Sequence, residues 1–371
     1  MKRYVLLSPA NPLRGGIASS TERLAQEIKA QGYEVDIFTF SLQYPAFLFP
    51  GKTQYTTDPA PEGIRIHSLI NSINPFNWIK VANKIAALNP DVVITRYWMP
   101  FMGPCLGTIC KYVKKKTSAR MVCLADNLIP HEHTPFDSFL TKWFLKHIDG
   151  MVVMSRSVGE DLRKFSSTIP FSFIPHPIYD NYGPKSDRAT AASRIGLDET
   201  KRYILFFGFI RDYKGLDILL EAYNKLRDLP ADLLIAGEFY AGEKSYKAMV
   251  DKFGLNSRVH FFSDYIPNDQ VSDFFAMADI VAQPYKTATQ SGISQLAYHF
   301  EKPMLVTKVG GLPEIVDHKK SGYVVDVNSD AVADALRDFF EEDRYSSMEE
   351  KTIAAKSRFS WEALFTALNS I

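Results

Sequence analysis

Short apolar runs alternate along the chain with longer segments in which apolar residues recur every three or four positions. Near the amino end, YVLLS at 4–8 is such a run, and the amphipathic segment STERLAQEIKAQG at 20–32 follows it. Ser19 or Ser20 can cap a helix there, and Gly32 can end it. Alternating strand-like runs and amphipathic segments predict a parallel sheet that is covered by helices on both faces.

The same rhythm restarts in the second half of the chain. The segment at 201–226 again reads as strand, glycine turn and helix, whereas the stretch at 177–200 before it is polar and only weakly periodic. We therefore predict an α/β fold with two doubly wound Rossmann-like domains that face a cleft, where small-molecule sites are common. The predicted boundaries are 1–180, 181–355 and a closing helix at 356–371 that crosses back to the first domain.

Composition excludes several classes of protein. The 371 residues suit two domains rather than one core, and a formal net charge of +1 gives no general attraction for nucleic acid. Three cysteines without metal-ligand spacing indicate reduced thiols, no metal site and a cytosolic protein. No apolar run approaches the roughly 18–20 residues of a spanning helix. The start reads as a first strand and not as a signal peptide.

Several motifs in the second half carry a family resemblance. They are FGFIRDYKGLDILLEAY, IAGE, the Asp279-Ile280 and Pro284 run, KPMLVTKVGGLPEIVDHKKSGYVV and FSWEALF, with Gly15-Gly16 in the first turn. One glycine turn alone is a weak signal, but the order and spacing of these motifs are specific. Together they resemble the retaining glycosyltransferases of family four, which have the GT-B fold, over nearly the whole length.

The resemblance implies a reaction and its substrates. It implies transfer of a sugar from a UDP- or GDP-linked nucleotide-sugar donor, with retention at the anomeric carbon and with neither a metal nor another cofactor. The second domain would hold the donor and the first domain the acceptor. A bacterial polysaccharide or a similar glycan is the expected product.

Two cations in the second domain are the first site candidates. The family has Arg directly after the glycine, whereas this chain has Phe209 there and Arg211 three residues before Lys214. Charge builds on the leaving diphosphate as the glycosidic bond breaks, and preorganised cations stabilise that transition state. We assign Arg211 and Lys214 to this catalytic role; a solvated pair on a loop is the alternative.

The stretch TATQSGISQLAYHFEKP lacks both glutamates of the family's Glu-x7-Glu pattern. Gln290 falls near the first position, and Gln295 or Leu296 near the second. Backbone amides and the dipole at a helix N-terminus can still bind phosphate there, so an ordinary capped helix is only the alternative. The predicted donor-binding residues of this stretch are Gln290, Ser291, Gly292 and Ile293.

Four more positions complete the predicted donor site. Gly15 and Gly16 would let backbone amides approach the diphosphate. Glu238 follows a predicted strand and can line the cleft, although a surface acid fits equally well. Ile266 falls in the loop that reads the base in the family, largely through its backbone.

The first domain contributes polar candidates at the ends of two strands. Asp126 replaces a histidine of many relatives and can hydrogen-bond a hydroxyl or accept a proton, and His131 follows in a Pro-His-Glu run. We assign these two residues to the reacting face. Arg96 and Asn127 are acceptor candidates, Arg96 for an anionic group such as a pyrophosphate. A hydrogen-bonded structural arginine is the alternative for Arg96.

A basic and aromatic surface is predicted in the same domain. CKYVKKKTSAR holds four lysines and Arg120, and the stretches at 42–51 and 96–103 are rich in aromatic residues. Such a surface suits a polyprenyl-linked acceptor and peripheral contact with the inner face of a membrane. A solvated helix face over core aromatics is the alternative.

Two other functions remain open from the sequence alone. A nucleotide-sugar epimerase would need several acid and base residues in the cleft. A non-catalytic protein that binds sugar nucleotides or glycans would be consistent with the two missing glutamates.

Overall fold

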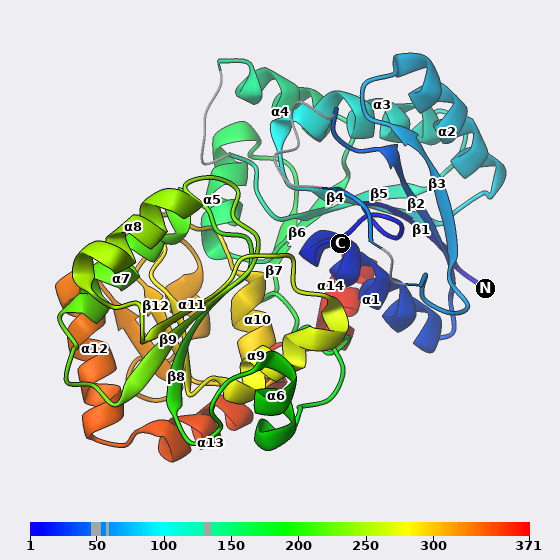
Figure 1. Cartoon of the computed structure of the whole chain (residues 1–371). Coiled ribbons are helices and arrows are strands. Elements are labelled where there is room, and N and C mark those ends of the chain that lie inside the picture. The colour runs from blue at the N-terminus through cyan, green and yellow to red at the C-terminus, as the bar shows by residue number, and fades with distance from the viewer. Residues whose placement is uncertain (46–52, 57–58, 130–134) are drawn as a thin grey trace. The chain divides into compact units, whose positions relative to one another are not determined.

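The computed structural model describes residues 1–45, 53–56, 59–129 and 135–371. Its contacts divide the chain into two compact units. Unit 1 is Met1–His176 together with Ser360–Ile371, and unit 2 is Pro177–Phe359. In each unit, helices cover both faces of a parallel sheet, as the sequence pattern predicted (Figure 1).

Unit 1 is built on a seven-stranded sheet with the order β3-β2-β1-β4-β5-β6-β7, in which every pair is parallel. The strands are β1 (Arg3–Leu7), β2 (Glu34–Leu42), β3 (Arg65–Asn71), β4 (Val92–Tyr97), β5 (Arg120–Ala125), β6 (Gly150–Val153) and β7 (Phe171–Phe173). The helices are α1 (Gly16–Ala30), α2 (Pro75–Ala87), α3 (Gly103–Lys114), α4 (Asp137–Leu145), α5 (Arg156–Phe165) and α14 (Trp361–Ser370).

Unit 2 is built on a six-stranded sheet with the order β10-β9-β8-β11-β12-β13, also parallel throughout. The strands are β8 (Arg202–Phe207), β9 (Ala231–Ala236), β10 (Val259–Phe262), β11 (Ile280–Gln283), β12 (Met304–Thr307) and β13 (Gly322–Val325). The helices are α6 (Arg188–Ile195), α7 (Leu216–Asn224), α8 (Glu243–Phe253), α9 (Val271–Met277), α10 (Gly292–His299), α11 (Leu312–Ile315), α12 (Ser329–Glu341) and α13 (Tyr345–Ala355).

The start of α1 differs from the prediction. Gly15, not Ser19 or Ser20, is the N-cap residue, and the helix begins at Gly16. The backbone of Gly15 has φ 110°, which a residue with a Cβ rarely adopts, so the turn ends at the glycine. Ser20 lies inside the helix, and its buried hydroxyl accepts a hydrogen bond from Arg96.

The closing helix α14 follows the prediction at both its cap and its apolar face. The Ser360 hydroxyl accepts a hydrogen bond from the Ala363 amide at 3.2 Å. Leu364, Phe365 and Leu368 are buried, together with Trp361. The Phe365 ring lies 5.5 Å from the ring of Tyr4 in β1, which fastens α14 within unit 1.

Each sheet reverses its strand order at one point. In unit 1, β1 lies between β2 and β4, and in unit 2, β8 lies between β9 and β11. Ligands of open α/β sheets bind outside the carboxyl ends of the strands at such points. The topology therefore predicts ligand-binding residues in the loops after β1 and β4, and in those after β8 and β11.

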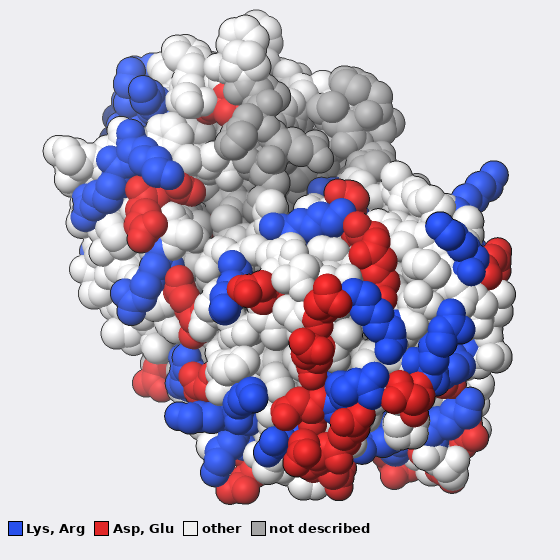
Figure 2. Space-filling view, turned by 90° about the vertical axis from the view of Figure 1, so that its left-hand side faces the viewer, with Lys and Arg blue, Asp and Glu red and all other residues white. Residues whose placement is uncertain are grey.

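The three cysteines are free and buried, in accord with the expected reduced thiols. Burial raises the pKa of the thiols of Cys105, Cys110 and Cys123. Basic and acidic residues interleave over much of the face seen in Figure 2, as the small net charge suggests. None of the helices in the described ranges is both long and apolar enough to cross a lipid bilayer.

Candidate functional site

Two glycines bring the loops after β8 and β9 together. Gly208 follows β8 with φ 92°, and Gly237 follows β9 with φ 140°. A Cβ on Gly237 would lie only 2.3 Å from the carbonyl oxygen of Gly208, so a side chain cannot be placed there. The backbone amide of Ile210 then donates to the Glu238 carbonyl at 2.9 Å. The loops after β8 and β9 are therefore held side by side at the carboxyl edge of the sheet in unit 2.

Lys214 and Arg211 supply positive charge at this edge. Lys214 ends a 3-10 turn, Asp212–Lys214, and only 9% of it is exposed. In unit 2, all of whose residues are described, neither cation has a carboxylate partner; the Arg211 guanidinium instead stacks on the Tyr240 ring at 3.6 Å. Burial, and then the charge of Arg211, lowers the pKa of Lys214 to about 7. A buried cation without a counter-ion is costly, so this pair favours binding of an anion.

The N-terminus of α10 meets these cations at Gly208. A Cβ on Gly208 would lie 3.0 Å from Cδ1 of Ile293 and 3.3 Å from Nζ of Lys214. Ser291 caps the helix by accepting from the Ile293 amide at 3.2 Å, and Tyr285 lies 3.3 Å from the Ser291 hydroxyl. The second residue of α10 and the Lys214 ammonium therefore lie around one glycine, with Arg211 three residues before Lys214 in the same loop. This combination suits a phosphate-bearing ligand.

Amide side chains occupy the interior behind this turn. Gln295 in α10 is 1% exposed, and its Oε1 has no hydrogen-bond partner within the described residues. Gln283, at the end of β11, accepts from the Ser294 hydroxyl at 3.0 Å, while its Nε2 lacks a partner there too. Gln290 is half-buried in the turn before α10. Gln290 and Gln295 are two of the residues that we predicted near the positions of the family's glutamates, with Leu296 as the alternative to Gln295.

The other predicted donor residues of unit 2 lie on the same edge. Glu238 is buried in the loop after β9, and Ile266 is half-buried in the loop after β10. Gly292 has a structural reason to be glycine, because a Cβ there would lie 2.8 Å from Cε2 of Tyr179. The close approach at Gly292 is therefore that of an aromatic ring of unit 2.

In unit 1, Arg96 and Asp126 are bound to each other. Arg96 Nε donates to Oδ2 of Asp126, and its Nη2 donates to Oδ1, both at 2.7 Å. The Arg96 side chain is only 4% exposed, and its Nη1 also donates to Ser20. This is the hydrogen-bonded arrangement that we weighed against direct acceptor binding.

The remaining unit 1 candidates are Asn127, His131, Gly15 and Gly16. Asn127 follows Asp126, and its buried Oδ1 has no partner among the described residues. His131 lies outside the described residues. A Cβ on Gly15 would meet no atom of the described residues within 4 Å. Gly16 is the first residue of α1.

Sequence reasoning missed four side chains of this region. Tyr240 and Tyr285 each follow a strand within four residues of its end, whereas Tyr179 and Gln283 carry no local signal. An aromatic residue directly after a buried strand could have marked the two tyrosines. The contacts of Tyr179 with Gly292 join residues far apart in sequence, so only the structure reveals them.

Comparisons with known proteins define the family. The model "Glycosyl transferases group 1" matches residues 187–358, and "Glycosyltransferase Family 4" matches residues 14–181. The chain is similar to D-inositol 3-phosphate glycosyltransferase of Corynebacterium glutamicum (strain R), with 30% identity over 99% of this chain and 93% of that relative. The protein of the same description from Corynebacterium jeikeium (strain K411) is 31% identical over the same shares. The chain belongs to glycosyltransferase family 4.

Solved structures share the fold. Sucrose-phosphate synthase from Thermosynechococcus elongatus has a TM-score of 0.78 and 18% identity, covering 100% of this chain and 97% of its own. Anabaena HepE in complex with UDP has a TM-score of 0.76 and 16% identity, covering 100% of both chains. The likeness confirms the predicted GT-B class of two Rossmann-like units.

Proposed function

We propose that the protein transfers a sugar from a nucleotide-sugar donor to a glycan or lipid-linked glycan, with retention and without a metal. One observation carries the donor part of this proposal. Lys214 and Arg211 lie at the carboxyl edge of unit 2, where no carboxylate of that fully described unit pairs with them, and Lys214 adjoins the N-terminal turn of α10. Neutral or metal-binding surroundings would not need two uncompensated cations there.

The two cations have a specific task in sugar transfer. Breaking the bond between the anomeric carbon and the diphosphate leaves a nucleoside diphosphate with growing negative charge. Lys214 and Arg211 would stabilise this charge, together with the amides of Gly292 and Ile293. Removing one such preorganised contact typically costs about 3–4 kcal/mol of transition-state stabilisation.

The acceptor proton needs a separate destination. Asp126 accepts hydrogen bonds from Arg96 at both carboxylate oxygens, which fixes the orientation of the carboxylate. We therefore assign Asp126 and Asn127 to orienting a hydroxyl group, with Arg96 as a positioning residue. The leaving diphosphate would take the proton on the face that it departs from, and attack from that face retains the anomeric configuration. His131 stays a candidate for the same face.

UDP is the first nucleotide to test. The solved neighbour Anabaena HepE is described in complex with UDP, and also with UDP-glucose. In this chain, the base and ribose would lie toward Ile266 and Glu238, and neither glutamate of the family's Glu-x7-Glu pattern is present to hold the ribose. GDP-linked donors remain the second choice.

An acceptor at a membrane is supported by the charge and exposure of one helix layer. Helices α2, α3 and α4 carry five lysines and one acid, Asp137, in a chain whose net charge is only +1. Phe76, Phe136 and Phe139, which lie at the starts of α2 and α4, are 79%, 72% and 68% exposed. Exposed aromatic rings beside lysines suit the interface of an anionic bilayer. We infer peripheral contact with the inner face of a membrane, as polysaccharide biosynthesis on lipid carriers requires.

A non-catalytic sugar-nucleotide binding protein is the second candidate. It is favoured by one observation, the replacement of both family glutamates by Gln290 and by Gln295 or Leu296. Such a protein would bind the nucleotide-sugar and never turn it over.

A thermal-shift panel followed by turnover assays tests both candidates. UDP, GDP and their sugar conjugates would be titrated, since a ligand raises the unfolding temperature according to its concentration over Kd. We expect stabilisation by one diphosphate family, then slow donor hydrolysis or transfer that chelators leave unchanged. Binding without turnover over a broad acceptor panel would favour the second candidate. No binding by any nucleotide would contradict both.

A further inference from the structure

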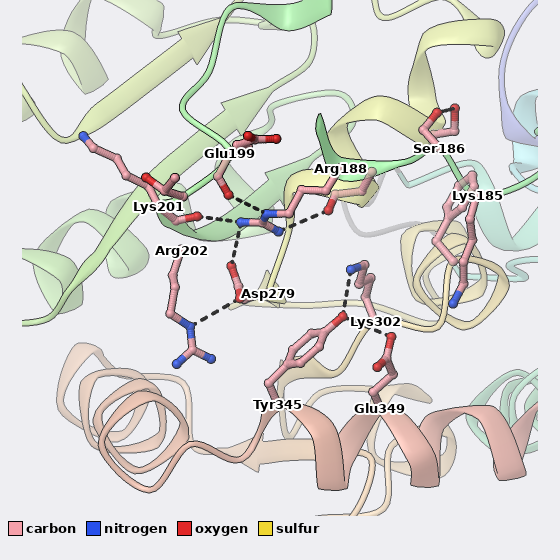
Figure 3. Close-up of a pocket in the computed structure, with 14 residues that line it drawn as sticks. Lys185, Ser186, Arg188, Glu199, Lys201, Arg202, Asp279, Lys302, Tyr345 and Glu349 are labelled. Carbon is pink, nitrogen blue, oxygen red and sulfur yellow. Dashed lines mark hydrogen bonds and ion pairs between the residues drawn. The ribbon is translucent and has the colours of Figure 1, made fainter. Parts of the chain in front are cut away.

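A pocket in unit 2 lies away from the candidate donor site (Figure 3). Its volume is about 450 Å³, within the range of small-molecule sites. Arg202 begins β8, Asp279 directly precedes β11, and Lys302 lies two residues before β12, so the pocket is at the amino ends of these strands. The candidate donor site is at their carboxyl ends. A six-residue strand separates the two edges by roughly 20 Å.

Most charged groups of this pocket are already engaged. Arg188 donates to the carbonyl oxygens of Glu199 at 3.0 Å and of Lys201 at 2.6 Å, and reaches Asp279 at 3.5 Å. Arg202 pairs with Asp279 through Nε at 3.3 Å, as Figure 3 shows. These groups hold the wall of the pocket. Lys185 pairs with Glu301, and Lys201 pairs with Asp232. The two lysines line the pocket, whereas the two acidic partners do not.

Lys302 is the exception among the cations. It is 8% exposed, and its Nζ donates to the neutral hydroxyl of Tyr345 at 3.0 Å. That hydroxyl donates in turn to Oε1 of Glu349 at 3.0 Å. Throughout unit 2, which is described in full, no carboxylate forms an ion pair with Lys302, and two of its three N–H groups have no acceptor.

The electrostatics agree with an anion site. Burial lowers the pKa of Lys302 to about 8. The charges of Arg188 and Lys185 lower this pKa further, whereas the charges of Asp279 and Glu349 raise it. A bound anion would restore the protonated form. Arg202 adds Nη2, which has no acceptor in the fully described unit 2.

The donors that are left suit a phosphate group. The forks of Arg188 and Arg202, which match flat carboxylates, are largely used by the backbone and by Asp279. What remains is the compact ammonium of Lys302 with two unused N–H groups, together with Nη2 of Arg202. A compact ammonium binds phosphate as a point charge. The volume exceeds that of phosphate alone and would admit a small organic phosphate.

One helix connects this pocket to the candidate donor site. Phe300 lines the pocket and is the C-cap residue of α10, whose first residue is Gly292. Eight helical residues span about 12 Å, and a short helix moves as one body. An occupant that shifts Phe300 or Lys302 would therefore shift the amides at the start of α10.

We propose that this pocket binds a phosphate group, as inorganic phosphate or on a small metabolite, and that its occupancy changes donor affinity through α10. The binding half of the proposal stands on the pocket alone. The coupling half rests on the proposed function.

Calorimetric titration in a Lys214→Met background tests the binding half, because that substitution weakens phosphate binding at the donor edge. Inorganic phosphate and a hexose phosphate would be titrated at constant ionic strength, with chloride as the balancing salt. We expect binding that weakens about tenfold or more when Lys302→Met is added. Tighter binding of the hexose phosphate would identify a metabolite as the ligand, and equal affinities would identify phosphate itself.

Two further variants make this test specific. Lys308→Met is the matched control, since Lys308 lies just beyond β12, is exposed and pairs with Asp326 at 3.0 Å. Tyr345→Phe keeps the ring and removes the hydroxyl, and we expect it to weaken phosphate binding even if Lys302→Met fails to fold. Equal affinity in the Lys302→Met, Tyr345→Phe and Lys308→Met proteins would overturn the site, as would absent binding in the Lys214→Met protein.

The coupling half is measured on the wild-type chain. The Kd for UDP would be determined with and without the phosphate ligand at saturation, and binding linkage requires a reciprocal effect. We expect the phosphate ligand to change the Kd for UDP in the wild-type chain and to leave this Kd unchanged in the Lys302→Met protein. An unchanged Kd overturns the coupling, whereas failure of UDP to bind at all contradicts the proposed function and leaves the phosphate titration interpretable.

Discussion

Arg96 and Asp126 hold each other through two parallel hydrogen bonds of 2.7 Å at the carboxyl ends of neighbouring strands β4 and β5. Both side chains are largely removed from water, with 4% and 13% exposed. The pair therefore fixes the orientation of Asp126 toward the strand ends, where the topology directs ligands.

Replacing Arg96 should strongly destabilise unit 1. Arg96→Met removes both charge-assisted hydrogen bonds from the largely buried Asp126 carboxylate, and breaking a buried pair in this way costs about 3–5 kcal/mol in comparable cases. Urea unfolding measures the loss. Arg337→Met is the control, because Arg337 and Asp228 pair on the surface with 37% and 67% exposed, where such pairs contribute about 0–1 kcal/mol. Similar losses for the two variants would show that the Arg96 pair has no special role.

Lys214 should dominate nucleotide binding. We expect Lys214→Ala to weaken UDP binding by about 1.5–3 kcal/mol, the scale of a hydrogen bond to a charged group. Gln295→Ala should have a smaller effect, because Gln295 is buried behind the turn. Calorimetric titration of both variants with UDP decides the order. Equal or reversed effects would remove Lys214 from the donor site.

The affinity for UDP should fall as pH rises. The pKa of Lys214 is lowered to about 7 in the free protein, and a bound diphosphate raises it. Binding is therefore strongest below pH 7 and weakens above it, until the pKa of the complex is passed. Titrations between pH 6 and pH 9 on the wild-type chain, with Lys214→Met as the pH-insensitive reference, test this. A slope of the same size in Lys214→Met would assign the effect to another group.

The free energy of unfolding should respond to pH in the opposite direction. Because the folded pKa of Lys214 lies below its unfolded value of 10.5, the unfolded chain binds more protons between about pH 7 and pH 10.5. In this window, the contribution of Lys214 to stability rises with pH. We expect the unfolding free energy of the wild type, minus that of Lys214→Met, to increase as pH rises through this window. A difference that does not change with pH would mean that Lys214 is solvated.

Gly208 should tolerate no side chain. In Gly208→Ala, the new Cβ would lie 3.0 Å from Ile293 and 3.3 Å from the Lys214 ammonium, on a backbone with φ 92°. We expect a loss of about 1–3 kcal/mol in stability, from strain and crowding, together with weaker UDP binding. Gly254→Ala is the control, since φ is 65° there and nothing lies within 4 Å. Unaltered UDP affinity in a folded Gly208→Ala protein would show that the ligand does not approach this glycine.

Exposed aromatic residues of α4 should contribute to membrane binding. The Phe136→Ser, Phe139→Ser double variant should bind less to vesicles that contain anionic lipid, and the loss should be accompanied by a salt dependence from the lysines. Flotation with anionic and neutral vesicles measures it. Ile353→Ser, at an exposed position of unit 2, is the control. Equal flotation of all variants would leave the lysine and aromatic surface without a membrane role.

Periodicity by itself determined most of the fold. Short apolar runs and amphipathic segments are local properties, and they predicted the strands, the cap of α14 by Ser360 and two Rossmann-like units. The start of α1 was missed, because the backbone of Gly15 at φ 110° ends the turn there, while the Ser20 hydroxyl accepts a hydrogen bond from Arg96, which is distant in sequence.

Only the tertiary structure decided which polar residues are available for chemistry. The sequence contains Lys214, Arg211, Arg96 and Lys302 as equivalent basic residues. Folding pairs Arg96 with Asp126 and leaves Lys214 and Lys302 buried without a carboxylate partner in unit 2. The sequence shows which residues carry a charge. Whether that charge is compensated depends on its burial and on neighbouring residues from distant segments, which come together only once the chain is folded.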